Sequence, residues 1–221
     1  MIIRNLGLID YNEACSLQER LARDVAGGNE EETLLLLEHP TVYTIGSGGD
    51  EKNILDTSIK AIRTNRGGDI TYHGPGQIIG YPVIDLSRRG RDLHNYLRFL
   101  EEFIMGIAAE FGVSTKRLSG STGVWCEALH NSAKLASIGV GVRRWVTMHG
   151  FALNVDIDPA PFALINPCGI AGCPITSLSR ELGRVVSMEE VREKTSRRFE
   201  ITLNSLLPID IRNKACKVVM S

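Results

Sequence analysis

The sequence predicts an α+β fold in which helices flank a mixed β-sheet. Some stretches carry apolar residues at helical spacing, and the remaining apolar residues fall into short runs typical of strands. Several of these runs are separated by turns too short to hold a helix, which favours hairpins over repeated strand-helix-strand units. A chain of 221 residues can bury a sizeable core, and we expect residues 1–221 to form a single domain.

The N-terminal half begins with an amphipathic helix, expected over residues 10–25. Asp10 and Glu13 form a capping-box pattern, and Gly27-Gly28 ends the apolar periodicity. The continuous apolar run at 33–38 predicts a buried strand, and 42–45 predicts a second one. The polar stretch 47–53 is expected to be an exposed loop. We then expect extended segments at 60–64 and 77–86, separated by a segment dense in glycine.

The C-terminal half begins with the clearest helix, over residues 92–111, which Gly112 ends. Its apolar stripe consists of Leu93, Tyr96, Leu97, Leu100, Ile104, Ile107, Ala108 and Phe111. Four strands are expected next, at 113–118, 123–127, 134–142 and 145–155, with Arg143-Arg144 as the turn between the last two. Ser187 and Glu190 form a second capping box, which opens a helix that buries Val191, Phe199 and Leu203.

Composition and charge exclude several classes of protein. The 25 basic and 26 acidic residues give a net charge of −1, which argues against a protein that coats nucleic acid. The apolar run 34–37 is far shorter than the roughly 18 residues of a membrane-spanning helix, so no membrane association is expected. The apolar stretches of the start, MIIRNLGLIDYNEA, are far too short for a signal-peptide core, so we expect no export signal. Five cysteines, an odd number, then indicate free thiols in a reducing, cytoplasmic setting.

The segment RGGDITYHGPGQ at 66–77 is too polar and too rich in glycine to be only a packing element. Glycine lets the backbone approach a ligand closely, while Arg66, Asp69, Tyr72 and His73 supply hydrogen-bonding groups. A structural turn with solvated polar residues is the alternative. The segment lacks the GxxxxGK[ST] spacing of a Walker A loop.

A cysteine lies between proline and glycine in the segment Asn166-Pro167-Cys168-Gly169-Ile170. Such a constrained loop can expose and aim a thiol, which attacks as a thiolate and needs a cation or base nearby. A buried cysteine that packs like a small apolar residue is the alternative. Cys168 and Cys173 have no matching Cys/His pair nearby, so we expect no metal site.

Lys134 begins an otherwise apolar strand, KLASIGVG. A lysine removed from water can act as a general base or acid, whereas a solvated lysine has no such role. In the next strand, TMHGFALNV at 147–155, the alternation of residue types indicates a strand that extends into a pocket. His149 is then either a wall residue of that pocket or a core histidine. Trp125 and Trp145 are expected to be packing residues.

These segments occur together in a known family. The combination of RGGDITYHGPGQ (66–77), KLASIGVGVRRWVTMHGFALNV (134–155) and INPCGI (165–170) resembles the lipoyl(octanoyl) transferases, and the similarity begins at EHPTVYTIG (38–46). The resemblance implies the fold of the catalytic module of biotin and lipoate protein ligases. It also implies transfer of octanoyl from the phosphopantetheine thiol of acyl carrier protein, with no other cofactor. The acceptor would be a lysine of a lipoyl domain, in a 2-oxoacid dehydrogenase subunit or the glycine-cleavage H protein.

The resemblance further implies which residues act. Cys168 would carry an acyl-thioester intermediate, and Lys134 would be its acid-base partner. The substrate site would be lined by Arg66, Gly67, Gly68, Asp69, Ile70, Thr71, Tyr72, His73, Ser137, Ile138, Gly139, His149, Gly150, Phe151 and Ala152. Two segments depart from the family pattern, 47–53 and the long connection 125–134, and both could reshape the rim where partners dock. Arg143-Arg144 and Arg88-Arg89 are the candidate docking patches for an acidic carrier protein.

Three other functions remain open. An ATP-dependent lipoate or biotin ligase would use the lysine without a catalytic cysteine. An amidotransferase would move octanoyl between lipoyl domains, again through cysteine. A noncatalytic acyl-binding or ligand-binding module would keep only the fold. The Pro-Cys-Gly loop and the expected lack of a sizeable C-terminal accessory domain favour the transferase over the ligase.

Overall fold

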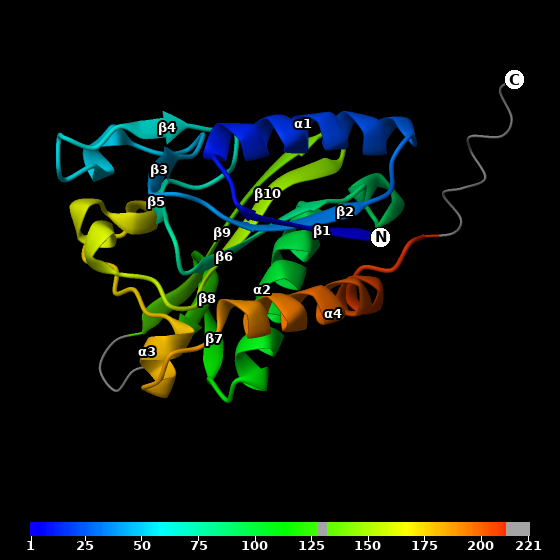
Figure 1. The fold of residues 1–221 in the computed structure, drawn as a ribbon. Helices are drawn as coiled ribbons and strands as arrows, with labels where there is room; N and C mark the ends of the chain where they lie inside the picture. Colours follow the sequence, from blue (N-terminus) through cyan, green and yellow to red (C-terminus); the bar gives the residue numbers. More distant parts are fainter. Residues whose placement is uncertain (128–131, 211–221) are drawn as a thin grey trace, which may run out of the picture.

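A mixed seven-stranded sheet forms the centre of the computed structural model, which describes residues 1–127 and 132–210 (Figure 1). The strand order is β1-β2-β6-β10-β9-β8-β7. β1 and β2 run parallel, and the other neighbouring pairs are antiparallel. The strands are β1 (Ile2–Leu8), β2 (Thr33–Glu38), β6 (Gln77–Val83), β7 (Thr115–Leu118), β8 (Ser121–Cys126), β9 (Ala133–Arg143) and β10 (Val146–Asn154).

A smaller sheet packs against the segment that leads to the cysteine loop. It contains β4 (Ala61–Arg63), β3 (Val42–Ile45) and β5 (Ile70–His73), in the order β4-β3-β5. Its buried apolar side chains cluster with three residues from 157–165, namely Ile157, Phe162 and Ile165. Burial of these side chains fixes the chain three residues before Cys168.

Helices cover both faces of the main sheet, so the predicted α+β class is confirmed (Figure 1). α1 (Tyr11–Gly27) packs on one face against β2, β6 and β10. α2 (Leu93–Glu110) and α4 (Met188–Leu206) pack on the other face, and the short α3 (Leu178–Leu182) follows the cysteine loop. No helix in the described parts of the chain is long and apolar enough to cross a membrane.

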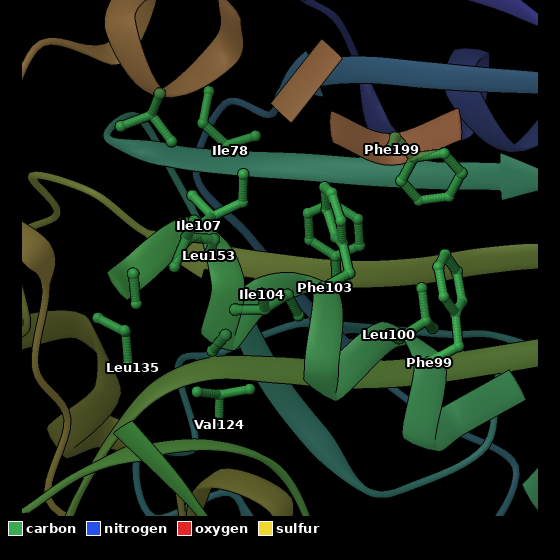
Figure 2. Packing of buried hydrophobic residues seen from close by; sticks show 14 of the residues in the cluster. Ile78, Phe99, Leu100, Phe103, Ile104, Ile107, Val124, Leu135, Leu153 and Phe199 are labelled. Carbon is green, nitrogen blue, oxygen red and sulfur yellow. The ribbon is translucent and has the colours of Figure 1, made fainter. Parts of the chain in front are cut away.

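The larger core lies between α2, α4 and the sheet, where aromatic rings interlock (Figure 2). Phe199 of α4 meets Phe99 and Phe103 of α2 edge to face, with ring centroids 5.4 and 5.0 Å apart. Each buried phenylalanine contributes roughly 1.5–3 kcal/mol by leaving water. The predicted stripe of α2 is buried except at two positions: Leu93 is 37% exposed because it lies in the first turn, and Leu97 is partly buried.

Helix ends follow the predicted capping residues. The Asp10 carboxylate accepts from the backbone N–H groups of Asn12 and Glu13, and Gly28 ends α1 at a φ of 76°. The Ser187 hydroxyl accepts from the N–H of Glu190, which opens α4 as expected. These caps satisfy backbone groups that the first and last turns leave unpaired.

Five details of the prediction need correction. β1 was not anticipated, because its mostly half-exposed residues give no continuous apolar run. β5 is a strand inside the glycine-dense segment, and the flanking glycines hide it. The strand expected at 77–86 ends at Val83, since Asp85 caps a 3₁₀ turn at Leu86–Arg88. The hairpin turn between β9 and β10 is Arg144-Trp145, and Trp145 is 39% exposed rather than packed. Part of the long connection 125–134 lies outside the described residues.

Candidate active site

Lys134 and Cys168, the two predicted catalytic residues, are in contact at one end of β9. The Nζ atom of Lys134 donates a hydrogen bond to Sγ of Cys168 at 2.9 Å. Lys134 is 1% exposed, and its Nζ lies 4.9 Å from the ring centroid of Trp125. An ammonium at this distance stabilises negative charge on the sulfur, and the thiolate is the nucleophilic form of cysteine. The arrangement therefore suits attack by Cys168 on an acyl group.

The cysteine loop is attached to the strand that carries the lysine. The backbone N–H of Lys134 donates to the carbonyl of Pro174 at 2.7 Å, and its carbonyl accepts from Thr176 N–H at 3.0 Å. Backbone pairing on both sides of Lys134 thus joins β9 to the segment that follows Cys168. This pairing explains how a residue of a strand and a residue of a loop come to share a hydrogen bond.

Cys168 has a backbone conformation that side-chain-bearing residues rarely adopt. Its φ is 58° and its ψ 23°, in the left-handed region, and Gly169 follows at a φ of 73°. For a residue with a Cβ atom this conformation costs roughly 1–2 kcal/mol. Such strain persists only where the surroundings fix it, and it is frequent at functional sites.

A pocket opens beside Cys168 and reaches the N-terminal end of α1. It holds about 460 Å³ of empty space, part of which is open to solvent. The lining residues are Tyr11, Arg66, Gly68, Asp69, Thr71, His73, Tyr81, Ser137, Ile138, Gly139, His149, Gly150, Phe151, Ala152 and Cys168. Most of the predicted substrate-site residues are therefore brought together around one cavity.

Glycines keep this cavity free of side chains where β9 and β10 pair. Gly139 lies opposite Gly150 in the ladder. A Cβ atom on Gly150 would lie 2.3 Å from the carbonyl oxygen of Gly80, and one on Gly139 would lie 3.1 Å from Cδ of Arg66. Any larger residue at position 150 would displace the backbone of β6, so this wall of the cavity requires glycine.

Three predicted residues, Gly67, Ile70 and Tyr72, support the pocket without lining it. Side chains along β5 alternate, so Thr71 and His73 face the pocket while Ile70 and Tyr72 join the core of the small sheet. Gly67 donates its N–H to the carbonyl of Val140 at 2.8 Å, which holds the glycine loop against β9.

Two lining residues, Tyr11 and Tyr81, were not predicted. Tyr11 is the first residue of α1, and Tyr81 lies in the buried strand β6. Neither position carries a sequence signal, because a tyrosine in a helix or an apolar strand reads as an ordinary packing residue. His39 does not line the pocket but supports Tyr81, whose hydroxyl lies 2.8 Å from Nε2 of His39.

Burial keeps the two pocket histidines neutral. It lowers the pKa of His73 to about 3, with further contributions from His39 and the positive charge of Arg66. Burial likewise lowers the pKa of His149 to about 4, and Arg66 adds to the effect. Histidines with such low pKa values are weak bases at neutral pH. Lys134, which touches the thiol directly, is the better placed group for proton transfer.

Arg66 brings a buried positive charge to the pocket. Its Nη2 donates to the carbonyl and hydroxyl oxygens of Thr44 at 2.8 and 2.9 Å, and its Nη1 donates to the carbonyl of Gly67. Its Nε is buried without a hydrogen-bond partner in the described chain. Burial lowers the pKa of the guanidinium, whereas nearby Tyr11 and Cys168 raise it. A cation in this position can stabilise negative charge that develops on a bound carbonyl oxygen.

The pocket offers donors suited to an acyl carbonyl and a thiol rather than a set of metal ligands. Within the described residues, no group of three or more His, Cys, Asp or Glu side chains is arranged to hold a metal ion. The expectation that the site works without a metal stays a prediction.

Comparisons with known proteins identify the family. Residues 10–200 match the family model described as the lipoyl protein ligase A/B catalytic domain. The octanoyltransferase of Geotalea uraniireducens is 63% identical over 95% of this chain and 96% of that protein. The octanoyltransferase of Geobacter metallireducens is 60% identical over 94% of this chain and 96% of that protein.

Solved structures show the same fold at much lower identity. A crystal structure of lipoate-protein ligase A bound with ATP has a TM-score of 0.67 and 18% identity, covering 92% of this chain and 86% of that chain. The biotin protein ligase of Aquifex aeolicus has a TM-score of 0.55 and 15% identity, covering 98% of this chain and 76% of that one. The chain thus belongs to the lipoyl protein ligase A/B catalytic-domain family, and within this family to the octanoyltransferases.

Proposed function

We propose that this octanoyltransferase holds the octanoyl group as a thioester on Cys168 between donor and acceptor, in the first step of protein lipoylation. The observation that supports this most directly is the 2.9 Å contact between Lys134 Nζ and Cys168 Sγ. An amine that can transfer a proton therefore touches Sγ of Cys168, the only thiol sulfur among the described residues that line the pocket. No further cofactor is required.

In the first half-reaction, the Cys168 thiolate attacks the carbonyl carbon of an octanoyl thioester. A bond forms between Sγ and that carbon, and the bond to the donor sulfur breaks. The donor sulfur takes a proton from Lys134 and leaves as a neutral thiol, and Lys134 becomes neutral. One thioester replaces another of similar energy, so this step needs no nucleotide.

In the second half-reaction, the amine of an acceptor lysine attacks the Cys168 thioester. An amide bond forms and the bond to Sγ breaks, which releases Cys168 as a thiolate. The proton lost by the amine is taken up by Lys134, which had become neutral in the first half-reaction and so regains its charge. Conversion of a thioester to an amide runs downhill and drives transfer. In both steps Arg66 faces the pocket with an unpartnered Nε, which suits stabilisation of the oxyanion.

The octanoyl donor in this proposal is acyl carrier protein, through its phosphopantetheine thioester. The acceptors are lipoyl domains of 2-oxoacid dehydrogenase subunits and the glycine-cleavage H protein. The similarity to octanoyltransferases supports an octanoyl substrate. The donor and acceptors themselves are those that the resemblance carried by the motifs at 66–77, 134–155 and 165–170 implies.

We place the docking surface for acyl carrier protein on a basic hollow between α1 and the β9–β10 hairpin. The hollow is lined by Ala22, Arg23, Ala26, Arg143 and Arg144. None of its three arginines forms an ion pair with an acidic residue in the described chain. Unpaired positive charge suits an acidic carrier and steers its approach.

The hollow is also within reach of the pocket. Arg143 pairs with Val146, and Gly139 pairs with Gly150 in the same ladder, so Arg143 and Gly139 lie on the α1 face of β9. They are four strand positions apart, or roughly 13 Å. A phosphopantetheine arm can span this distance to Gly139, which lines the same pocket as Cys168. The other predicted patch is unsuitable, because Arg89 is buried and ion-paired with Glu32 at 2.6 Å.

Intact-protein mass spectrometry after incubation with octanoyl carrier protein tests the thioester. The chain should gain the mass of one octanoyl group on Cys168, and hydroxylamine should remove it. Cys168→Ser should gain nothing, while Cys173→Ser, a control five residues along the same loop, should be acylated normally. Octanoyl that binds without a covalent adduct would overturn the proposal and favour an acyl-binding module.

A further inference from the structure

The left-handed backbone of Cys168 needs a support that Lys134 does not provide. The lysine touches the sulfur, but its backbone bonds go to Pro174 and Thr176, beyond the strained residue. Without other contacts, rotation of φ at Cys168 toward the common negative values would relieve strain and turn Sγ away from Nζ. Within the loop, the N–H of Gly169 donates to the carbonyl of Asn166 at 3.0 Å, which closes a turn around Cys168. The conformation of Cys168 therefore depends on what holds Asn166 in place.

The contacts that hold Asn166 come from Asn53, at the end of the polar segment 47–53. The carbonyl of Asn53 accepts from the N–H of Asn166 at 2.7 Å, and Oδ1 of Asn53 accepts from Nδ2 of Asn166 at 3.4 Å. Ile54 and Ile165 form an antiparallel bridge directly beside this pair. Asn53 and Ile54 thus pair with the chain two and three residues before Cys168.

The side chain of Asn53 is in turn fixed by Asp69 in the pocket wall. Its Nδ2 donates to Oδ2 of Asp69 at 2.8 Å, and Oδ1 of Asp69 accepts from the N–H of Ile70 at 2.6 Å. A hydrogen bond to a carboxylate is stronger than one between neutral groups. Asp69, Asn53 and Asn166 therefore form a continuous chain of hydrogen bonds from β5 to the cysteine loop.

Asn53 and Asp69 also support the chain on the C-terminal side of Cys168. A Cβ atom added to Gly169 would lie 3.0 Å from Oδ2 of Asp69 and 3.5 Å from Nδ2 of Asn53. The backbone of Gly169 thus packs directly against the Asn53–Asp69 hydrogen bond. The chain is thus held on both sides of Cys168, two residues before it at Asn166 by hydrogen bonds and directly after it at Gly169 by close packing.

We propose that Asn53 is a positioning residue for acyl transfer, which holds Cys168 in its left-handed conformation and so aims Sγ at Lys134 Nζ. It acts through Asp69 and Asn166 and does not touch the reacting atoms. The proposal rests on the proposed function, in which Cys168 is the nucleophile. Asn53 lies outside the motifs at 66–77, 134–155 and 165–170, in the segment that departs from the family pattern.

Asn53→Asp is the sharpest test, because it keeps the shape of the side chain and replaces the donor to Asp69 with a second carboxylate. We expect the rate of Cys168 alkylation by iodoacetamide to fall about 10- to 100-fold, the range that a misplacement of roughly 1 Å can cost. The kcat for octanoyl transfer should fall similarly, with the KM for the lipoyl domain unchanged. Loss of fold alone would lower both the melting temperature and acceptor binding.

Two further variants keep the test decisive. Asp69→Asn combined with Asn53→Asp restores a donor-acceptor pair and should return the alkylation rate to within about threefold of wild type, as expected for directly coupled residues. Thr57→Asp adds the same charge at an exposed position of the neighbouring segment and should leave the rate unchanged. If Asn53→Asp does not fold, Asn53→Ala removes the donor without introducing repulsion and should still slow alkylation.

The outcomes separate this inference from the proposed function. If wild type forms the octanoyl adduct and Asn53→Asp or Asn53→Ala alkylates at the wild-type rate, the positioning role is wrong and the thioester stands. If the double variant stays as slow as Asn53→Asp, the route through Asp69 is wrong. If wild type forms no adduct on Cys168, the proposed function fails, whatever Asn53 does to alkylation.

Discussion

Lys134 and Cys168 are 34 residues apart in sequence, yet one hydrogen bond of 2.9 Å joins their side chains. Backbone bonds from Lys134 to Pro174 and Thr176 hold the two segments together. The lysine is nearly fully buried, so its charge has few partners other than the sulfur and the Trp125 ring. A change at either side chain should consequently alter the chemistry of the other.

Replacement of Lys134 should slow both half-reactions while leaving the thiol in place. We expect Lys134→Ala to lower single-turnover rates about 10²–10⁴-fold, the range for loss of a general acid or base. Lys134→Arg should be nearly as slow, because a guanidinium favours a thiolate but does not exchange its proton. Cys168→Ser should form no acyl adduct at all.

The measurement is iodoacetamide alkylation of Cys168 against pH, together with single-turnover transfer. An unchanged alkylation profile and transfer rate in Lys134→Ala would show that the lysine is not the acid-base partner. His73 or His149 would then be the candidate base, in spite of the low pKa values that burial gives them.

Only some residues of the site could be predicted from the sequence. Cys168, Lys134 and the glycine-rich segment were recognisable because polar or glycine residues interrupt apolar patterns there. Tyr11 and Tyr81 were not, since their part in the pocket depends on α1 packing against β6, a contact between distant segments. Asn53 was likewise hidden, because an asparagine in an exposed polar stretch carries no sign of the residue it bonds to.

The helices and strands likewise include some that could be predicted from the sequence and some that could not. Capped helices such as 92–111 and apolar strands such as 33–38 could be predicted, because their patterns are local. β1 and β5 could not, since each is a strand mainly by virtue of its neighbour, β2 for the first and β3 for the second. Pairing between strands that are distant in sequence gives only a weak pattern in the residues of either strand.

Octanoyl transfer should run at its full rate in EDTA with no nucleotide added. Thioester exchange is nearly isoenergetic and amide formation is downhill, so ATP has no step to drive. The sequence also lacks a Walker A loop. The assay follows octanoyl on an apo lipoyl domain, with and without ATP and magnesium. Strict dependence on ATP would instead support a lipoate or biotin ligase.

Reversal of charge in the basic hollow should weaken the encounter with acyl carrier protein. We expect Arg143→Glu with Arg144→Glu to raise the carrier KM about tenfold or more at low ionic strength, with a smaller change in kcat. The effect should fade as salt screens it. Arg197→Glu, at an exposed position of α4, changes the net charge as much as Arg143→Glu alone and should leave KM unchanged. An increase in the carrier KM for Arg197→Glu as large as that for Arg143→Glu would place the docking surface elsewhere.

Stability should fall in mild acid because His149 is buried in its neutral form. Its pKa is about 4 in the folded chain, lowered by burial and by Arg66, against about 6.5 when unfolded. Above pH 6.5 the residue is neutral in both states and has no effect. As the pH falls from 6.5 toward 4, the unfolded chain binds a proton that the folded chain does not, which lowers the free energy of unfolding by up to roughly 3 kcal/mol.

His149→Asn removes this titration and suits the φ of 55° at this position, which asparagine tolerates better than most residues. Urea unfolding between pH 7 and 4.5 should therefore give a flatter dependence of stability on pH in His149→Asn than in wild type. Some slope should remain, because burial also lowers the pKa of His73 and of His39. His94→Gln, at an exposed position of α2, is the control and should keep the wild-type slope. Parallel curves for wild type and His149→Asn would mean that His149 takes up its proton in the folded chain as readily as in the unfolded one, and that the pocket around Arg66 is more open to water than its buried walls indicate.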